Sequence, residues 1–195
     1  MLALLLAAAA ALPSAASSPR PPPAPPPELW HGARAGMTPA EVKALFPQAR
    51  APIAINPGPP PIANMVDGGG GAGLAVDEVV FGHPAVATYY FAGGHLLSVI
   101  VEVQNMQLRH TRDNVDVARE VQVGLADYYG PPKVCVDTDK RGLARLDCRW
   151  VVRGAQVGLS YVDYGGLNPS LSVAARQLPA KKRMVPAVFG RRGVH

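Results

Sequence analysis

The sequence lacks most of the features by which an enzymatic activity is recognised. No G-x-S-x-G motif marks a nucleophile elbow, and the glycine run at 68–71 lacks the G-K-[ST] ending of a phosphate-binding loop. No C-x-x-C or H-x-x-x-H pair offers the clustered ligands of a zinc site. We therefore predict that the chain is not an enzyme, that it has no catalytic residue, and that it binds neither a cofactor nor a metal.

Long apolar runs are absent after the first residues. Residues 1–12 are continuously apolar, but a membrane-spanning helix needs about 20 such residues. Pro13 and the small residues at 14–18 follow, which is the arrangement of a secretory signal peptide with cleavage after Ala16. No cysteine near that position could accept a lipid. The sequence therefore predicts a signal peptide at 1–16 and a soluble product that is periplasmic or secreted.

Acidic residues are missing from the C-terminal end of the chain. Residues 181–195 contain five Lys or Arg and no Asp or Glu, whereas the rest of the chain has 14 residues of each sign. A basic tail at 179–195 can make a weak contact with an anionic surface such as lipid or lipopolysaccharide. Because an exported protein does not meet the nucleic acids of the cell, we predict no nucleic-acid partner.

Proline is concentrated in the first third of the chain. Residues 17–28, SSPRPPPAPPPE, contain seven prolines, and such a run is stiff and adopts the polyproline II conformation. An SH3-type ligand is one interpretation of this run. In an exported chain we favour a Pro-rich spacer at 17–35. A second segment rich in Pro and Gly, at 51–73, is predicted to be a loop.

Cysteine is scarce, and its two copies are Cys135 and Cys148. In an exported protein, a small even number of cysteines indicates a disulfide. A buried reduced pair and half of a metal site are the alternatives. Pairing strand 133–137 with strand 145–152 around a turn at 141–142 sets the two cysteines opposite each other. The disulfide would close a loop of about 14 residues and stabilise the fold by roughly 3 kcal/mol in the chain-entropy model.

Two helices and seven strands are predicted after residue 36. Thr38-Pro39-Ala40-Glu41 is a capping box that begins a short helix, which Pro47 ends. A longer helix over about 113–129 has one apolar stripe and ends at Gly130. Strands are predicted at 76–82, 86–92, 96–103, 133–137, 145–152, 155–163 and 170–176.

This order of elements predicts an α+β fold, with an antiparallel sheet and two helices packed on one face. Two-residue turns at Gly93-Gly94 and Arg153-Gly154 would join neighbouring strands. We place a single domain at 36–178. The repeated order of a helix and then strands also fits two αβββ-like halves, at 36–110 and 111–178.

Aromatic residues make up only 6% of the sequence, so the tyrosines on predicted strands stand out as candidate contacts. Neighbouring strand residues point to opposite faces of a sheet, so one member of the pair Tyr89-Tyr90 should be exposed. Exposed tyrosines on a sheet face suit a protein contact. We therefore name Tyr89, Tyr90 and Tyr161 as a candidate binding surface, with core filling as the alternative.

Residues 36–47, GMTPAEVKALFP, resemble the first helix of the SmpA/OmlA family, the outer-membrane assembly lipoproteins of the BamE type. The later strand order is similar to that of β-lactamase inhibitory protein-like domains. The chain differs from the lipoproteins because it has no lipid-accepting cysteine and has Pro47 where they usually have glycine. The resemblance implies a non-enzymatic, protein-binding module of the cell envelope.

The expected function is therefore that of an exported protein-binding or scaffold module whose partner is an envelope protein. Two alternatives stay open. The first is a secreted enzyme inhibitor, by analogy with the β-lactamase inhibitory protein. The second is an enzyme whose site the sequence motifs do not reveal.

Overall fold

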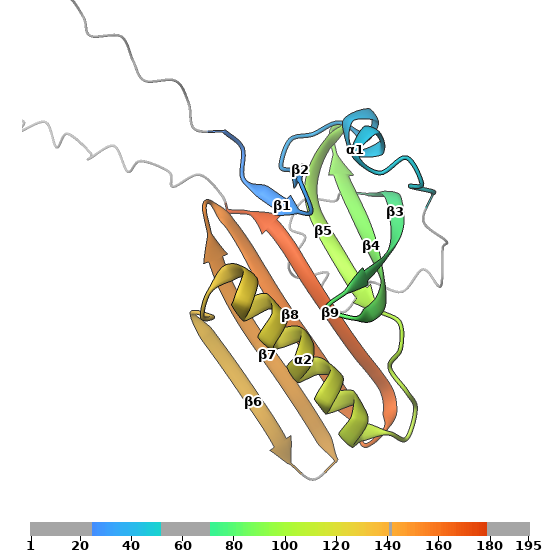
Figure 1. Ribbon diagram of the computed structural model, residues 1–195, viewed down its shortest axis with the longest axis vertical. Helices are drawn as coiled ribbons and strands as arrows, with labels where there is room; N and C mark the ends of the chain where they lie inside the picture. Colours follow the sequence, from blue (N-terminus) through green and yellow to red (C-terminus); the bar gives the residue numbers. More distant parts are fainter. Residues whose placement is uncertain (1–24, 52–70, 141, 179–195) are drawn as a thin grey trace, which may run out of the picture.

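A computed structural model describes residues 25–51, 71–140 and 142–178 (Figure 1). The predicted signal peptide at 1–16, the first part of the Pro-rich spacer and the basic tail at 179–195 lie outside the described residues. So does most of the loop predicted at 51–73. These four assignments therefore stay predictions.

The described residues form nine strands and two helices. The helices are α1 (Pro39–Leu45) and α2 (Thr111–Tyr129). The strands are β1 (Glu28–Trp30), β2 (Ala33–Arg34), β3 (Gly71–Val80), β4 (His83–Ala92), β5 (His95–Val103), β6 (Val134–Lys140), β7 (Leu143–Val152), β8 (Ala155–Tyr164) and β9 (Leu167–Gln177). All seven predicted strands and both predicted helices are present.

Seven strands form one antiparallel sheet in the order β3-β4-β5-β9-β8-β7-β6. Consecutive hairpins link β3 to β5 and β6 to β9, and the pairing of β5 with β9 joins the two groups. The connection from β5 to β6 contains α2, which returns the chain to the far edge of the sheet (Figure 1). β9, the last strand among the described residues, thus lies at the centre of the sheet.

Two-residue turns set the register of the hairpins. Gly93 and Gly94 between β4 and β5 have φ values of 58° and 79°, and Arg153 and Gly154 between β7 and β8 have 44° and 88°. Positive φ at both central residues is the type I′ conformation, whose twist matches that of the paired strands. Both turns predicted from the sequence are confirmed.

The core lies between α2 and the sheet. The helix crosses β7, β8 and β9 on one face (Figure 1), and its residues Ala118, Val121 and Leu125 are fully buried. These positions recur every three or four residues, which places them on one side of a helix. They share one apolar cluster with alternate residues of the strands, among them Leu146, Cys148, Trp150, Val157, Leu159 and Tyr161.

The short helix α1 begins as predicted. Thr38 Oγ1 accepts from the Glu41 backbone N–H at 3.3 Å, and the Glu41 carboxylate accepts from the Thr38 N–H at 2.7 Å. These two bonds are the capping box, and they satisfy two backbone donors that a helix start leaves free. Only Val42 of this helix is buried, and Leu45 is exposed.

The predicted fold class is wrong. Strands account for 54% of the structure and helices for 20%, so the fold is mostly β. The two helices do not form one layer over the sheet, because α1 is short and has a single buried side chain, Val42, whereas α2 alone crosses β7, β8 and β9. The predicted order of a helix and then strands occurs twice, as α1 with β3–β5 and as α2 with β6–β9. The pairing of β5 with β9 joins all seven strands into one sheet.

Residues 28–35 belong to the fold, whereas the sequence analysis placed them in the spacer. Leu29 and Trp30 of β1 and Ala33 of β2 are buried in the main core, as is Ala35. The Ala35 N–H donates to the Pro27 carbonyl at 3.0 Å, next to this hairpin. Strands of three and two residues are too short to show an alternating pattern, so the preceding prolines dominate the prediction.

A disulfide joins the two edge-proximal strands β6 and β7. Cys135 and Cys148 are register partners with Cα atoms 4.1 Å apart. The predicted bond is confirmed, and the reduced pair and the metal half-site are excluded for these two residues. The bond fits an oxidising compartment outside the cytosol.

Candidate functional site

The C-terminal end of α2 and the turn between β7 and β8 enclose a surface groove of about 340 Å³. We call it the aromatic groove. Its walls come from the helix end, from the hairpin and from β1. The lining residues are Glu28, Tyr128, Tyr129, Val152, Arg153, Ala155 and Val157.

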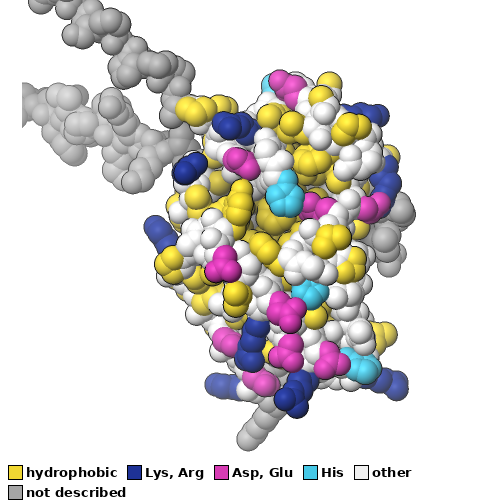
Figure 2. Space-filling view, in the orientation of Figure 1, with side chains coloured by type: hydrophobic (Ala, Val, Ile, Leu, Met, Phe, Trp, Pro, Cys, Tyr) yellow, Lys and Arg dark blue, Asp and Glu magenta, His cyan; other side chains and the backbone are white. Residues whose placement is uncertain are grey.

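A smaller recess of about 50 Å³ shares Tyr128 and Tyr129 with the groove and is also lined by Trp30, His31 and Phe81. Three parts of the chain that are distant in sequence therefore meet here. Figure 2 shows hydrophobic side chains gathered over this upper part of the face, whereas acidic and basic side chains dominate the lower part. Groove and recess together form one aromatic surface.

The two tyrosines at the end of α2 differ in burial. Tyr128 is 64% exposed and Tyr129 is half-buried, with the two rings edge to face and their centroids 4.7 Å apart. Burial is the main cause that raises the pKa of the Tyr129 hydroxyl above its ordinary value, followed by the neighbouring Tyr128 hydroxyl and then by the negative charge of Glu28. This hydroxyl therefore keeps its proton at neutral pH and can donate a hydrogen bond.

A buried tryptophan fixes the helix end that carries these tyrosines. Gly130 ends α2 with a φ of 83°, and its carbonyl accepts from Trp150 Nε1 at 2.8 Å. Trp150 is itself buried on β7. Because Gly130 follows Tyr129 directly, this bond holds the aromatic wall against the sheet.

The turn between β3 and β4 supplies Phe81 to the recess. Phe81 has a positive φ of 49° and Gly82 one of 90°, so this is another type I′ turn. The Phe81 ring lies so close to Gly124 of α2 that a Cβ added to that glycine would sit 2.3 Å from a ring carbon. Glycine at position 124 is thus required for the hairpin tip to pack on the helix.

Glu78 of β3 orients two residues of the recess. One carboxylate oxygen accepts from Trp30 Nε1 at 2.8 Å, and the other lies 3.0 Å from His31 Nδ1. The hydrogen bond to Glu78 is the main cause that raises the pKa of His31 above its ordinary value, while its partial burial acts in the opposite direction. Glu78 therefore stabilises the protonated form of His31.

The tyrosines named from the sequence do not form an exposed surface. Tyr89 and Tyr161 are 0% and 1% exposed and belong to the core between the sheet and its covering elements. Tyr90 is half-buried on the opposite face of β4. For Tyr89 and Tyr161 the alternative of core filling is the correct one, because their positions alternate in phase with the buried strand residues.

The residues of the aromatic groove were missed by the sequence analysis. Tyr128 falls at the next step of the apolar stripe of α2 and is therefore expected in the core, and Trp30 lies within the predicted spacer. One signal was available: Tyr128-Tyr129 stand directly before the helix stop at Gly130, where the helix leaves the sheet. When an apolar stripe continues to the end of a helix, its last residue can lie beyond the edge of the core, where its side chain is exposed.

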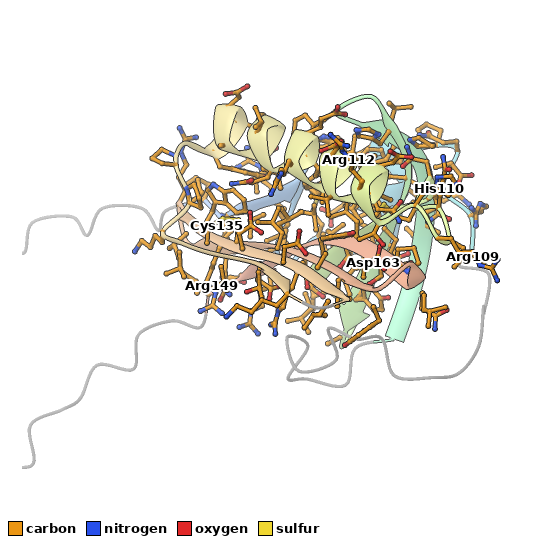
Figure 3. The ribbon with its side chains drawn as sticks, turned by 90° about the horizontal axis from the view of Figure 1, so that it is seen from below. Arg109, His110, Arg112, Cys135, Arg149 and Asp163 are labelled. Carbon is orange, nitrogen blue, oxygen red and sulfur yellow. A yellow bond between two sulfur atoms is a disulfide. The ribbon has the colours of Figure 1, made fainter. Side chains whose placement is uncertain are left out.

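The other end of α2 holds a closed polar cluster. Asp163 is 0% exposed, and its carboxylate accepts from the Gly166 N–H at 2.5 Å, from the Tyr161 hydroxyl at 3.3 Å and from Asn114 Nδ2 at 3.4 Å. Asn114 also bonds both backbone groups of Gln107. Figure 3 places Asp163 under the end of the helix where Arg112 lies, away from Cys135. This cluster fixes the start of α2 and offers no accessible acceptor.

A histidine with a carboxylate partner bridges β4 and α2. His83 Nε2 lies 2.9 Å from Glu120 Oε2, and Asn105 Nδ2 lies 3.1 Å from His83 Nδ1. A histidine oriented by a carboxylate resembles part of a catalytic relay. The two hydrogen-bond partners of this histidine are the Glu120 carboxylate on α2 and the Asn105 amide after β5. The arrangement supports a structural bridge between hairpin and helix.

Within the described ranges, no group of three or more His, Cys, Asp or Glu side chains is placed to hold a metal ion. Neither described helix combines the length and the apolar character that crossing a membrane would require. Comparisons of the chain with protein-family models, with curated proteins and with solved structures give no match.

Proposed function

We propose that this protein is an exported, non-enzymatic binding module that holds an extended peptide segment of a cell-envelope protein in the aromatic groove. The observation that carries the proposal is the groove itself. It places an exposed tyrosine, a half-buried tyrosine and a tryptophan-lined recess on one surface. Tyrosine and tryptophan are the residues in which binding energy is most often concentrated at protein interfaces.

The lining of the groove suits a peptide in particular. Tyr128 and the half-buried Val152 offer apolar contact to side chains, and the Tyr129 hydroxyl can donate to a peptide carbonyl. Glu28 and Arg153 add one charge of each sign, so a segment with a basic residue would find a carboxylate. The volume of about 340 Å³ lies at the lower end of the range for ligand sites, which is enough for a few residues of an extended chain.

The elements around the groove are held in place before any partner arrives. Trp150 ties the end of α2 to β7, and Glu78 ties Trp30 and His31 to β3. Side chains fixed in this way lose little conformational entropy on binding, and such preorganisation favours affinity. A surface that contacts only water does not need its side chains to be held in fixed positions by such hydrogen bonds.

The location of the protein supports the same proposal. The Cys135–Cys148 disulfide fits an oxidising compartment, and the predicted signal peptide at 1–16 indicates export. We propose that the protein acts in the periplasm or after secretion, where its partners are proteins of the envelope.

Two tyrosine variants test the proposal in matched form. Tyr128 and Tyr164 are 64% and 59% exposed and lie near opposite ends of α2. The protein is tagged and used to capture partners from the envelope of its native host, with the recovered proteins quantified by mass spectrometry.

The expected result is one envelope protein enriched by the wild-type chain and by Tyr164→Ala, and lost with Tyr128→Ala. Removing a central aromatic contact should weaken binding by about tenfold or more. A partner that is captured equally by all three chains would bind elsewhere and would contradict the assignment of the groove.

A further inference from the structure

A Pro-rich segment of the chain, next to β1, has a composition that suits the aromatic groove. Residues 17–27 contain seven prolines and one charged residue, Arg20. The last three of these residues run directly into β1, and the Pro27 ring lies 3.9 Å from the position that a Cβ would take on Gly154. Gly154 follows Arg153, which lines the groove. The Pro-rich segment therefore starts from the rim of the groove.

The spacing of the segment matches what an aromatic groove can bind. A polyproline II helix has three residues per turn, so Arg20, Pro23 and Pro26 fall on one ridge. Aromatic-lined grooves recognise such ridges because the proline rings pack against flat side chains and because the preformed helix loses little entropy on binding. The carboxylate of Glu28 in the groove is complementary to the charge of Arg20.

The described end of the segment, Pro25–Pro27, favours a groove on another molecule as the binding site. Pro25 and Pro26 are exposed, and neither of them lines the groove. A polyproline II segment rises about 3.1 Å per residue and is stiff over several residues. This conformation disfavours the sharp reversal that a Pro-rich segment would need to enter a groove that begins beside its own Pro27. Eight residues in the polyproline II conformation span roughly 25 Å, a length that is enough to meet a neighbouring molecule.

We infer that residues 19–26 of one copy occupy the aromatic groove of a second copy, in a reciprocal exchange that makes the chain a homodimer. The inference rests on the proposed function, since it uses the same groove: the segment fills the groove in the dimer, and a peptide of an envelope protein binds there by displacing it. An exchange in which each copy gives a segment and receives one is an isologous, closed arrangement. Two linked contacts also reinforce each other, because the second forms within an already assembled pair.

The test measures self-association of the purified protein with residues 17–27 intact. Sedimentation equilibrium is recorded for the wild type, for Tyr128→Ala and for the matched control Tyr164→Ala. A synthetic peptide of residues 17–27 is then added as a competitor, and a peptide with Arg20→Glu and Pro23→Ala serves as its control.

We expect the wild type to dimerise and Tyr128→Ala to raise the dimer dissociation constant by about tenfold or more. Tyr164→Ala should change it by less than about twofold, as surface substitutions away from a contact do. The wild-type peptide should convert dimer to monomer, and the altered peptide should not.

Three outcomes would overturn the inference. A protein that remains monomeric while the peptide binds would mean that the occupant is not a second copy. A dimer that survives Tyr128→Ala would be formed by another surface. A peptide that does not bind would exclude the Pro-rich segment as the ligand. The synthetic peptide could fail to bind while capture of an envelope protein still depends on Tyr128. In that case only this inference is wrong, and the proposed function stands.

Discussion

The two ends of helix α2 differ in the residues that surround them and in what those residues contact. At the first end, Asp163 and Asn114 are buried and pair with each other and with backbone groups. At the last end, Tyr128 and Trp30 line open hollows, and the polar atoms of Glu78 serve only to orient their neighbours. One end is closed by hydrogen bonds, and the other exposes the Tyr128 ring to solvent beside the buried Trp30.

This difference separates residues that stabilise the fold from residues that are free to bind. A buried carboxylate persists only where donors surround it, and every contact of Asp163 is internal. An exposed tyrosine contributes little to the free energy of folding. Its presence at the surface is therefore better explained by a contact with a binding partner. Substitutions at the closed end should therefore lower stability, and substitutions at the open end should lower binding.

The largest expected effect is at the closed end. Asp163→Ala leaves the Gly166 N–H, the Tyr161 hydroxyl and one N–H of Asn114 without their acceptor inside the fold. We expect a loss of about 4 kcal/mol in the free energy of unfolding, measured by chemical denaturation. Asp163→Asn keeps one acceptor oxygen and should lose less. Equal losses for the two variants would mean that the hydrogen bonds are not the cause.

The disulfide gives the next largest effect. Replacing Cys135 and Cys148 together by serine removes the constraint on a loop whose ends are 13 residues apart. The chain-entropy model predicts a loss of about 3 kcal/mol in the free energy of unfolding. Reduction of the wild type, followed by the same denaturation measurement, should give a similar loss. An unchanged midpoint would show that the paired strands β6 and β7 do not depend on the bond.

The support of the open end is tested by Trp150→Phe. This substitution keeps an aromatic ring in the core and removes the bond to the Gly130 carbonyl. We expect a loss of about 2 kcal/mol in stability, from the hydrogen bond and the lost volume. Hydrogen exchange should accelerate at residues 126–130 and remain slow around Asn114. Uniform acceleration along α2 would contradict the independence of its two ends.

The smallest effect concerns pH. The pKa of His31 is raised in the fold, mainly by its bond to Glu78, so the pair adds stability below the ordinary pKa of histidine, near 6.5. That contribution is lost as the pH rises through the raised pKa. Because the pair is half-exposed, we expect a change of about 0.5 kcal/mol or less. His31→Gln should remove the pH dependence of thermal unfolding in this range, and a dependence that survives would belong to another group.

Local patterns in the sequence predicted the parts of the fold that depend on near neighbours. The capping box at Thr38, the turn at Gly93-Gly94 and the Cys135–Cys148 pair follow from spacing within about 15 residues. The fold class required knowing how much of the sheet each helix covers. The weak apolar face of α1 was given the same weight as the long stripe of α2, although only Val42 is buried.

The groove could not be predicted because it depends on contacts between distant parts of the chain. Trp30 and Tyr128 are almost 100 residues apart in the sequence, and they line one recess only because β1 lies beside the end of α2. The period of the helix places Tyr128 on the apolar stripe but does not show where the sheet ends. In the same way, the alternation of β4 and β8 does not show that Tyr89 and Tyr161 face the core.

Site-specific photo-crosslinking tests the central claim most directly. A photoreactive phenylalanine analogue replaces Tyr128 in one chain and Tyr164 in another, and both chains are illuminated in the native envelope. We predict an adduct from position 128 that maps to one extended segment, either of an envelope protein or of residues 19–26 of a second copy, and none from position 164. Equal adducts from both positions, or none from position 128, would contradict the assignment of this groove as the binding surface.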